Sequence, residues 1–224
     1  MIEELLPDSV VAVEAYGDDE TDGAPLYPGE EALVARAVAK RRREFTAVRA
    51  CARRAMEKLG VPPQPILTGE RGAPRWPQGL AGSMTHCDGY RAAALVRAAD
   101  LASLGIDAEP HGPLPDGVLA TVALPGERER LDRLAAAHPE VHGDRLLFSA
   151  KESVYKAWFP LTGEWLDFAE ADIAIEADSG AGGRFRAELL VPGPVVAGRR
   201  LTHFTGRWTV GRDLVVTAVT VPHV

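Results

Sequence analysis

Two carboxylates lie two residues apart in the segment Gly-Ile-Asp-Ala-Glu-Pro, at Asp107 and Glu109. The segment is typical of a short strand, on which residues two apart point to the same face. Two neighbouring carboxylates repel each other unless a cation lies between them. A third carboxylate, Glu152, follows downstream between Lys151 and Lys156. Three carboxylates suit a hard dication such as Mg²⁺ and lysines suit phosphate oxygens, so the pattern indicates a metal-dependent enzyme acting on a phosphate ester.

Each of these residues also has an ordinary structural interpretation. An isolated Asp-x-Glu pair is more often a solvent-facing part of an edge strand. Glu152 and Lys156 are four residues apart on a predicted helix, where an exposed ion pair contributes only a few tenths of a kcal/mol. They belong to a polar stripe opposite the apolar stripe of that helix, whereas Lys151 lies near the apolar edge, where a lysine usually extends its stem toward water. The chemical interpretation therefore depends on the three carboxylates occurring together.

A second group of chemically capable residues lies upstream of the acids. Seven basic residues occur between positions 40 and 54, and a solvated helix face is their ordinary explanation. Arg49 is the exception, because it lies at the border of an apolar stripe formed by residues such as Phe45 and Met56. His86 ends a predicted strand beside a turn, where a single histidine is more often structural than catalytic. The loop 69–82 is rich in glycine and could hold a phosphate with backbone N–H groups, although it lacks any established phosphate-binding spacing.

The composition limits the class of protein. The chain has 224 residues, of which 46% are hydrophobic and 25% charged, which fits one large or two small globular domains. A net charge of -7 argues against nucleic acid as the main partner. The two cysteines form no Cys-x-x-Cys pair, so zinc is not expected and a reducing compartment is favoured. Without a membrane-length apolar run or a basic leader, we expect a cytoplasmic protein with no membrane partner.

The pattern of elements repeats once along the chain. The first part predicts a strand at 9–15, a loop at 17–29, helices over 30–59 with a break near residues 42–44, and strands at 83–87 and 90–97. The second part predicts a strand at 103–108, a mostly helical region over 117–137, a helix at 144–159, and strands at 171–177, 184–191, 201–210 and 214–221. The sequence therefore predicts an α+β fold of two similar halves, residues 1–102 and 103–224.

Four segments, taken in order, resemble the Sfp-type 4′-phosphopantetheinyl transferases. They are Gly69–Pro77, Gly82–Cys87, Gly105–Glu109 and Phe148–Trp158. The resemblance implies two α+β halves related by a pseudo-twofold axis, with coenzyme A bound in the cleft between them. It also implies transfer of the phosphopantetheine arm to a serine of an acyl or peptidyl carrier protein, with release of adenosine 3′,5′-bisphosphate. A doubled fold would permit a monomer, which we expect.

The resemblance implies a role for individual residues by their position. Mg²⁺, with Mn²⁺ as an alternative, would be held by Asp107, Glu109 and Glu152. The coenzyme A contacts would be Arg41, Arg49, Arg71, Arg75, Ser83, His86, Lys151 and Lys156. Among these, the first two would bind the 3′-phosphate, and His86 with Lys156 would bind the pyrophosphate and act in catalysis. Many relatives carry a lysine near Thr68, so a contact made there would be missing or supplied by Arg71 or Arg75. Glu152 is either a general base or only a metal ligand.

Two other functions fit the same residues. The three carboxylates would also serve another Mg²⁺-dependent phosphoryl-transfer enzyme, such as a phosphodiesterase or a nucleotidyl transferase. A binding module without catalysis is the other alternative, in which the carboxylates only organise the contact between a strand and a helix.

Overall fold

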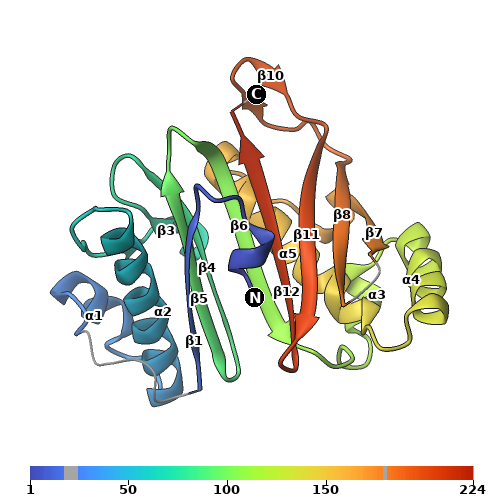
Figure 1. Cartoon of the computed structure of the whole chain (residues 1–224), viewed down its shortest axis with the longest axis horizontal. Helices are drawn as coiled ribbons and strands as arrows, with labels where there is room; N and C mark the ends of the chain where they lie inside the picture. The colour runs from blue at the N-terminus through green and yellow to red at the C-terminus, as the bar shows by residue number, and fades with distance from the viewer. Residues whose placement is uncertain (18–24, 179–180, 224) are drawn as a thin grey trace.

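The computed structural model describes residues 1–17, 25–178 and 181–223, and its two main sheets lie side by side (Figure 1). The first sheet has the order β1-β5-β4 and is antiparallel. Helix α2 packs on one face of this sheet. The bounds are β1 Val11–Tyr16, α2 Ala39–Lys58, β4 Leu80–Cys87 and β5 Tyr90–Arg97.

The second sheet has five antiparallel strands in the order β6-β12-β11-β8-β7. Helix α5 lies against β6 and β12, behind the sheet in Figure 1. The bounds are β6 Leu101–Pro110, α5 Gly143–Thr162, β7 Ala171–Ala177, β8 Gly182–Leu189, β11 His203–Gly211 and β12 Leu214–Pro222. The shorter elements are η1 Glu3–Leu5, α1 Pro28–Val34, β2 Leu67–Thr68, η2 Glu70–Gly72, β3 Pro74–Arg75, α3 Val118–Val122, α4 Pro125–Ala137, η3 Phe168–Glu170, β9 Val195–Val196 and β10 Arg199–Arg200.

The two halves share one topology, as the sequence predicts. In each half the first strand pairs with the last strand, and the last strand pairs with the one before it, which gives β1-β5-β4 and β6-β12-β11. In each half a helix of 20 residues, α2 or α5, connects the first strand to the later ones. The fold is therefore α+β with two similar halves. A core on the face opposite the two long helices joins the two halves, because Ile2 and Tyr90 of the first half and Val216 of the second belong to one buried cluster.

Two hydroxyl groups join the halves where β4 meets β6. Ser83 Oγ accepts the backbone N–H of Ile106 at 3.0 Å, and Thr85 Oγ1 accepts that of Ala108 at 3.2 Å. Strand β6 pairs with β12 on its other edge, so these two N–H groups point toward β4. The side chains of β4 thereby satisfy backbone donors that would otherwise be buried without a partner.

A glycine brings α5 against β6. A Cβ atom at Gly105 would lie 2.0 Å from the carbonyl oxygen of Ser153 and 2.7 Å from the amide of Ala157, closer than any real contact. Two residues earlier, Ser103 donates to the carbonyl oxygen of Ala157 at 2.7 Å. Because residues two apart share a face of the strand, Asp107 also faces α5. The absent side chain at position 105 therefore sets the distance between the acidic strand and the helix.

Several local predictions were wrong in their bounds. The helix break lies at residues 35–38, not near residues 42–44, because Val38 is extended (φ -62°, ψ 155°) and α2 begins directly after it. Strand β4 starts at Leu80, whose pairing with Arg97 extends the hairpin. The loop before it contains the small hairpin β2-β3. The helical region 117–137 is divided between α3 and α4, since Pro125 begins a new helix. Most of the loop expected at 17–29 lies outside the described residues.

The polar stripe of α5 is only partly accessible, with Glu152 and Lys156 half-buried, although an exposed stripe is its ordinary interpretation. Ser149 and Ser153 are both fully buried. Ser149 lies 3.0 Å from the hydroxyl of Thr217 on β12, so the stripe faces the sheet. No helix in the described part of the chain combines the length and apolarity needed to cross a membrane.

Candidate active site

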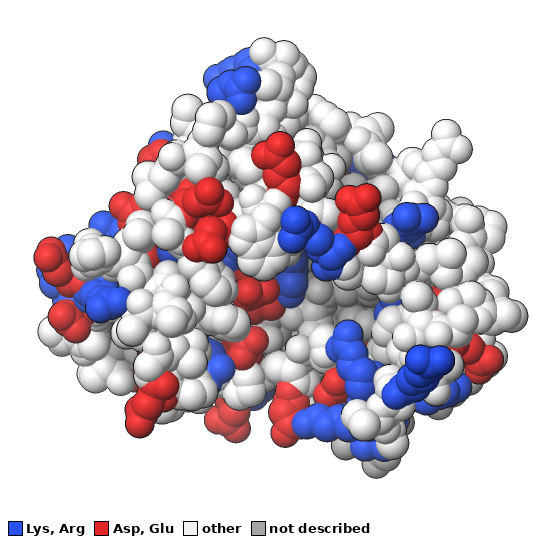
Figure 2. All heavy atoms as spheres, turned by 180° about the vertical axis from the view of Figure 1, so that it is seen from behind, with Lys and Arg blue, Asp and Glu red and all other residues white. Residues whose placement is uncertain are grey.

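A pocket of about 640 Å³ lies between the two halves. Helix α2, the loop that contains β2 and β3, and strand β4 line one wall, and α5 lines the other. Seen from behind, the molecule is hollowed near the middle of this face, with acidic and basic side chains around the hollow (Figure 2). The lining residues include eight of the sequence-predicted site residues: Arg41, Arg49, Arg71, Arg75, Ser83, His86, Glu152 and Lys156. The fold therefore brings most of the predicted site residues together from segments far apart in the sequence.

Asp107 is a buried carboxylate with one unpartnered oxygen. Its side chain lies on β6 beside the pocket and is 6% exposed. Oδ1 accepts hydrogen bonds from Lys156 Nζ at 2.7 Å and from the hydroxyl of Thr85 at 3.2 Å. Oδ2 is buried and has no hydrogen-bond donor. A buried polar atom without a partner costs free energy, so this oxygen is a place where a cation or another donor would be stabilising.

The other two predicted acids differ in their partners. Glu109 contacts Arg145 at 3.1 Å. Burial and the neighbouring charge of Asp107 raise its pKa, and Arg145 opposes that rise. Burial also raises the pKa of Glu152, with Asp107 adding to the rise and Lys156 opposing it. Lys156 contacts Asp107, in place of the exposed pair with Glu152 that is the ordinary structural interpretation of these two residues.

The arrangement of the acids fits a divalent cation held by one or two protein carboxylates better than one held by three. No group of three or more His, Cys, Asp or Glu side chains among the described residues is arranged to hold a metal ion. Mg²⁺ is commonly held by one or two carboxylates together with substrate phosphates and water. Asp107 offers an unpartnered oxygen. Glu152 lies close enough to Asp107 for the negative charge of Asp107 to raise the pKa of Glu152. Glu109 is engaged by Arg145, so its role as a ligand stays a prediction.

Arg49 forms the inner part of the opposite wall. Its guanidinium donates from Nε to the carbonyl oxygen of Ile66 at 3.0 Å and from Nη2 to the hydroxyl of Thr68 at 3.4 Å. It also lies 3.2 Å from the centre of the Phe45 ring. Burial lowers the pKa of Arg49 to about 10, and the negative charge of Glu30 opposes this lowering. The group therefore stays cationic at neutral pH and suits an anionic ligand.

His86 faces the pocket in its neutral form. Arg41 Nη1 lies 2.8 Å from His86 Nε2, which must accept this hydrogen bond because a guanidinium only donates. Burial lowers the pKa of His86, and the positive charge of Arg41 lowers it further, although Glu44 opposes this. A neutral imidazole with Nε2 as acceptor carries its proton on Nδ1. His86 therefore supplies hydrogen-bonding capacity to the pocket without a positive charge of its own.

Lys151 lies outside the pocket, in contrast to the prediction. Its side chain is 3% exposed, and Nζ lies 2.9 Å from a carboxylate oxygen of Glu127. It also donates to the carbonyl oxygens of Phe168 and Ala171 at 2.5 and 2.9 Å. All three donor positions of the ammonium are therefore used by protein acceptors. This lysine ties α5 to α4 and to the start of β7, and it does not extend toward water as expected.

The sequence reasoning missed three residues that contact predicted site residues: Arg145, Glu30 and Trp165. Arg145 lies seven residues before Glu152, a spacing that places both on one face of α5 and could have indicated the contact with Glu109. Glu30 belongs to the short helix α1 and reaches Arg49 only through the tertiary fold. Arg71 lies 5.7 Å over the ring of Trp165, so the loop of the first half contacts the second half.

Comparisons with known proteins give two family matches. Residues 29–96 match the model described as 4′-phosphopantetheinyl transferase N-terminal domain, and residues 103–192 match that of the 4′-phosphopantetheinyl transferase superfamily. The sequence is 62% identical over 222 residues to the 4′-phosphopantetheinyl transferase Svp of Streptomyces mobaraensis, covering 99% of this chain and 89% of that protein.

Two further relatives are similar over different lengths. The 4′-phosphopantetheinyl transferase PptT of Mycobacterium tuberculosis is 50% identical over 222 residues, covering 98% of this chain and 97% of that protein. Enterobactin synthase component D of Salmonella typhi is 34% identical over 119 residues, covering 53% of this chain and 49% of that protein.

Proposed function

The chain belongs to the 4′-phosphopantetheinyl transferase superfamily, and from this premise we propose which donor it uses, which acceptor it modifies and which residues act. The proposed donor is coenzyme A, and the proposed acceptor is a serine of an acyl or peptidyl carrier protein. The reaction depends on Mg²⁺, with Mn²⁺ as an alternative, and releases adenosine 3′,5′-bisphosphate.

The pairing of the two pocket walls carries this proposal. On one wall, Arg49 and Arg41 present positive charge, which suits the isolated 3′-phosphate of the donor. On the other wall, Lys156 contacts Oδ1 of Asp107, whose Oδ2 has no partner, and this arrangement suits a pyrophosphate that shares a divalent cation with the protein. Coenzyme A has both anionic groups, at opposite sides of its ribose, so one molecule would engage both walls.

Each residue near the reacting atoms has a proposed task. The serine oxygen of the carrier protein forms a bond to the phosphorus next to pantetheine, and the bond from that phosphorus to the leaving adenosine 3′,5′-bisphosphate breaks. Lys156 donates to the pyrophosphate and stabilises the negative charge that grows on the leaving phosphate. Asp107 and Glu152 would hold the divalent cation, which supplies further neutralisation of this charge when bound.

Glu152 is also the proposed base for the serine proton. Burial raises its pKa toward the range in which a carboxylate accepts a proton effectively at neutral pH. Turnover of Glu152→Gln measured across pH distinguishes the two roles, because loss of a base removes the acidic limb of the profile. Full activity of this variant would remove Glu152 from both roles.

Mass spectrometry of a carrier protein tests the function directly. Incubation with this protein, coenzyme A and Mg²⁺ should add the mass of one phosphopantetheine to the carrier. The matched controls are a carrier with its acceptor serine replaced by alanine and a reaction with a chelator, and both should show no gain. An unmodified carrier together with hydrolysed coenzyme A would favour a phosphodiesterase. Absence of Mg²⁺-dependent coenzyme A binding by calorimetry would favour a module without catalysis.

A further inference from the structure

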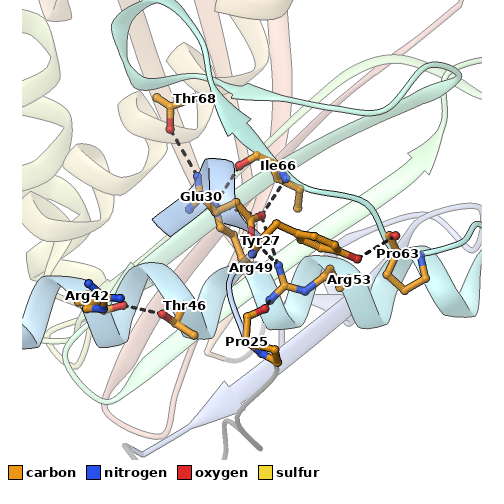
Figure 3. Close-up of polar contacts among 10 residues, drawn as sticks. All are labelled: Pro25, Tyr27, Glu30, Arg42, Thr46, Arg49, Arg53, Pro63, Ile66 and Thr68. Atoms are coloured by element: carbon orange, nitrogen blue, oxygen red, sulfur yellow. Dashed lines mark hydrogen bonds and ion pairs between the residues drawn. The ribbon is translucent and has the colours of Figure 1, made fainter. Parts of the chain in front are cut away.

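A carboxylate with no exposed surface lies behind Arg49, away from the reacting atoms. Glu30, on the short helix α1, is fully buried among residues from α2 and the segment before β2 (Figure 3). Burying a carboxylate is costly unless it is paired and hydrogen-bonded. Glu30 is therefore neither a solvating surface residue nor part of a surface ion pair.

Both oxygens of Glu30 are used by protein donors. Oε1 accepts the backbone N–H of Ile66 at 2.8 Å, and Oε2 accepts that of Tyr27 at 2.9 Å. Arg53 Nη1 lies 3.0 Å from Oε2 and 3.3 Å from Oε1. Arg49 Nε lies 3.7 Å from Oε1. Figure 3 shows these groups gathered on one side of α2. Glu30 is thus fixed by α1, by α2 and by the segment that leads into the pocket loop.

Arg49 shares the carboxylate of Glu30 with a second arginine. The exposed fractions of the Arg49 and Arg53 side chains are 5% and 7%. Of the two arginines, Arg49 lines the pocket. Arg49 therefore presents its positive charge to the pocket, while Glu30 lies behind it.

The contacts of Arg49 divide its guanidinium into an inner and an outer side. Nε faces inward, toward Glu30 and the carbonyl oxygen of Ile66, and Nη2 faces the hydroxyl of Thr68 at the pocket loop. Because the group is planar and rigid, fixing Nε also fixes the direction of the outer N–H donors. A phosphate bound by two parallel N–H groups requires that direction to be maintained.

We propose that Glu30 is a positioning residue that holds Arg49 in the orientation that binds the 3′-phosphate of coenzyme A. The inference rests on the proposed function, since it takes Arg49 as the contact for that phosphate. On this view α1 serves to deliver Glu30, and selection for a 3′-phosphorylated donor depends on a residue that never touches the donor.

Calorimetry with two nucleotides isolates this effect from turnover. The probes are adenosine 3′,5′-bisphosphate and adenosine 5′-monophosphate, which differ by the 3′-phosphate alone. The wild-type protein should prefer the bisphosphate, and Arg49→Gln should remove most of this preference, with Arg41 retaining the rest. Glu30→Gln keeps the shape of the side chain and should reduce the preference by roughly tenfold, the value of one charged hydrogen bond that a less firmly oriented Arg49 would lose to the 3′-phosphate. Its Kd for the monophosphate should stay unchanged.

The chain offers a matched control one residue away. Glu31 is exposed on the same helix and contacts Arg42 at 3.6 Å, so Glu31→Gln changes the same charge without touching Arg49. It should keep the full preference. Steady-state kinetics give a second measurement, because the ratio of kcat/KM for coenzyme A to that for dephospho-coenzyme A should fall in Glu30→Gln while the turnover number with saturating coenzyme A is retained.

The possible outcomes separate the two proposals. A folded Glu30→Gln with the wild-type preference would overturn the role of Glu30 and leave Arg49 as the phosphate contact. A wild-type protein without any preference would instead remove Arg49 from the 3′-phosphate, and the inference would fail with it. If Glu30→Gln does not fold, Glu30→Asp decides, because it keeps the charge but draws it back from Arg49. A partial loss of preference supports the proposal, and a full preference contradicts it.

Discussion

Glu30 and Asp107 are buried carboxylates, one in each half of the molecule, and they differ in how completely they are paired. Glu30 accepts from two backbone N–H groups and faces two arginines. Asp107 accepts from Lys156 and Thr85 through one oxygen, and its other oxygen has no donor. A carboxylate with every acceptor position filled maintains the shape of the fold, whereas one with an unfilled position is available to a ligand.

The difference extends to the charge of the two pocket walls. Two guanidinium groups, Arg49 and Arg53, lie around Glu30, and Arg49 presents its positive charge to the pocket. Around Asp107 there are three carboxylates, those of Asp107, Glu109 and Glu152. Two cations contact them, Lys156 at Asp107 and Arg145 at Glu109. One wall therefore suits an anion and the other suits a cation shared with an anion. Two halves with one topology therefore present walls of different charge to one pocket.

The largest expected effect comes from separating α5 from β6. Gly105→Ala places a Cβ atom 2.0 Å from a backbone oxygen of α5, so the helix has to move away from the acidic strand. We expect a loss of about 4 kcal/mol in the free energy of unfolding, together with loss of turnover. Gly112→Ala is the control, because a Cβ there meets nothing within 4 Å. Denaturant unfolding and the carrier assay measure both effects, and equal stability of the two variants would contradict the prediction.

Neutralising the two carboxylates tests the comparison itself. Asp107→Asn should reduce kcat by roughly 10³-fold because it would remove a proposed ligand of the divalent cation, and its melting temperature should stay near the wild-type value. Glu30→Gln should lower the free energy of unfolding by about 3 kcal/mol, because two buried arginines lose their counter-charge. Calorimetric melting and steady-state kinetics measure the two effects. An Asp107→Asn protein that melts as early as Glu30→Gln would show that both carboxylates are structural.

Two lysines on α5 sharpen the distinction between structure and chemistry. Lys156→Met should reduce kcat/KM by about 10²-fold with little loss of stability, because its ammonium is partly exposed and faces the pocket. Lys151→Met leaves Glu127 buried without its cation and should cost about 3 kcal/mol of stability, with an unchanged KM for coenzyme A. Thermal melting and donor titration distinguish them. A raised KM in Lys151→Met would return this lysine to the site.

The smallest expected effect concerns the protonation of His86. Burial and the neighbouring charge of Arg41 lower the pKa of His86. Arg41→Ala removes a positive charge, so the pKa should rise and a larger fraction of the imidazole should be protonated at pH 6. NMR titration of the ring protons measures this change. An unchanged pKa would mean that burial alone sets it, and that the contact at 2.8 Å has no electrostatic consequence.

The sequence predicted the elements of the fold better than their ends. The hairpin of β4 and β5, the strand with Asp107 and the long helix with Glu152 all follow from periodicity over many residues. The break before α2 was placed too late because residues 39–43 are exposed, so no apolar stripe marks where that helix begins. Burial of Ser149 and Ser153 was missed because a buried serine and an exposed serine are the same letter in a helical pattern.

By itself the sequence determined the repeated strand–helix–strand order, the acidic strand and the candidate site residues, because these depend on residue types and spacing along the chain. Only the tertiary structure decided which of those residues meet. In the folded chain Lys151 contacts Glu127, Glu109 contacts Arg145, and Glu30 lies behind Arg49. Each of these pairings joins groups at least 18 residues apart, and all are set by close approach of packed elements, such as the contact that Gly105 permits. Local pattern carries no information about such distances.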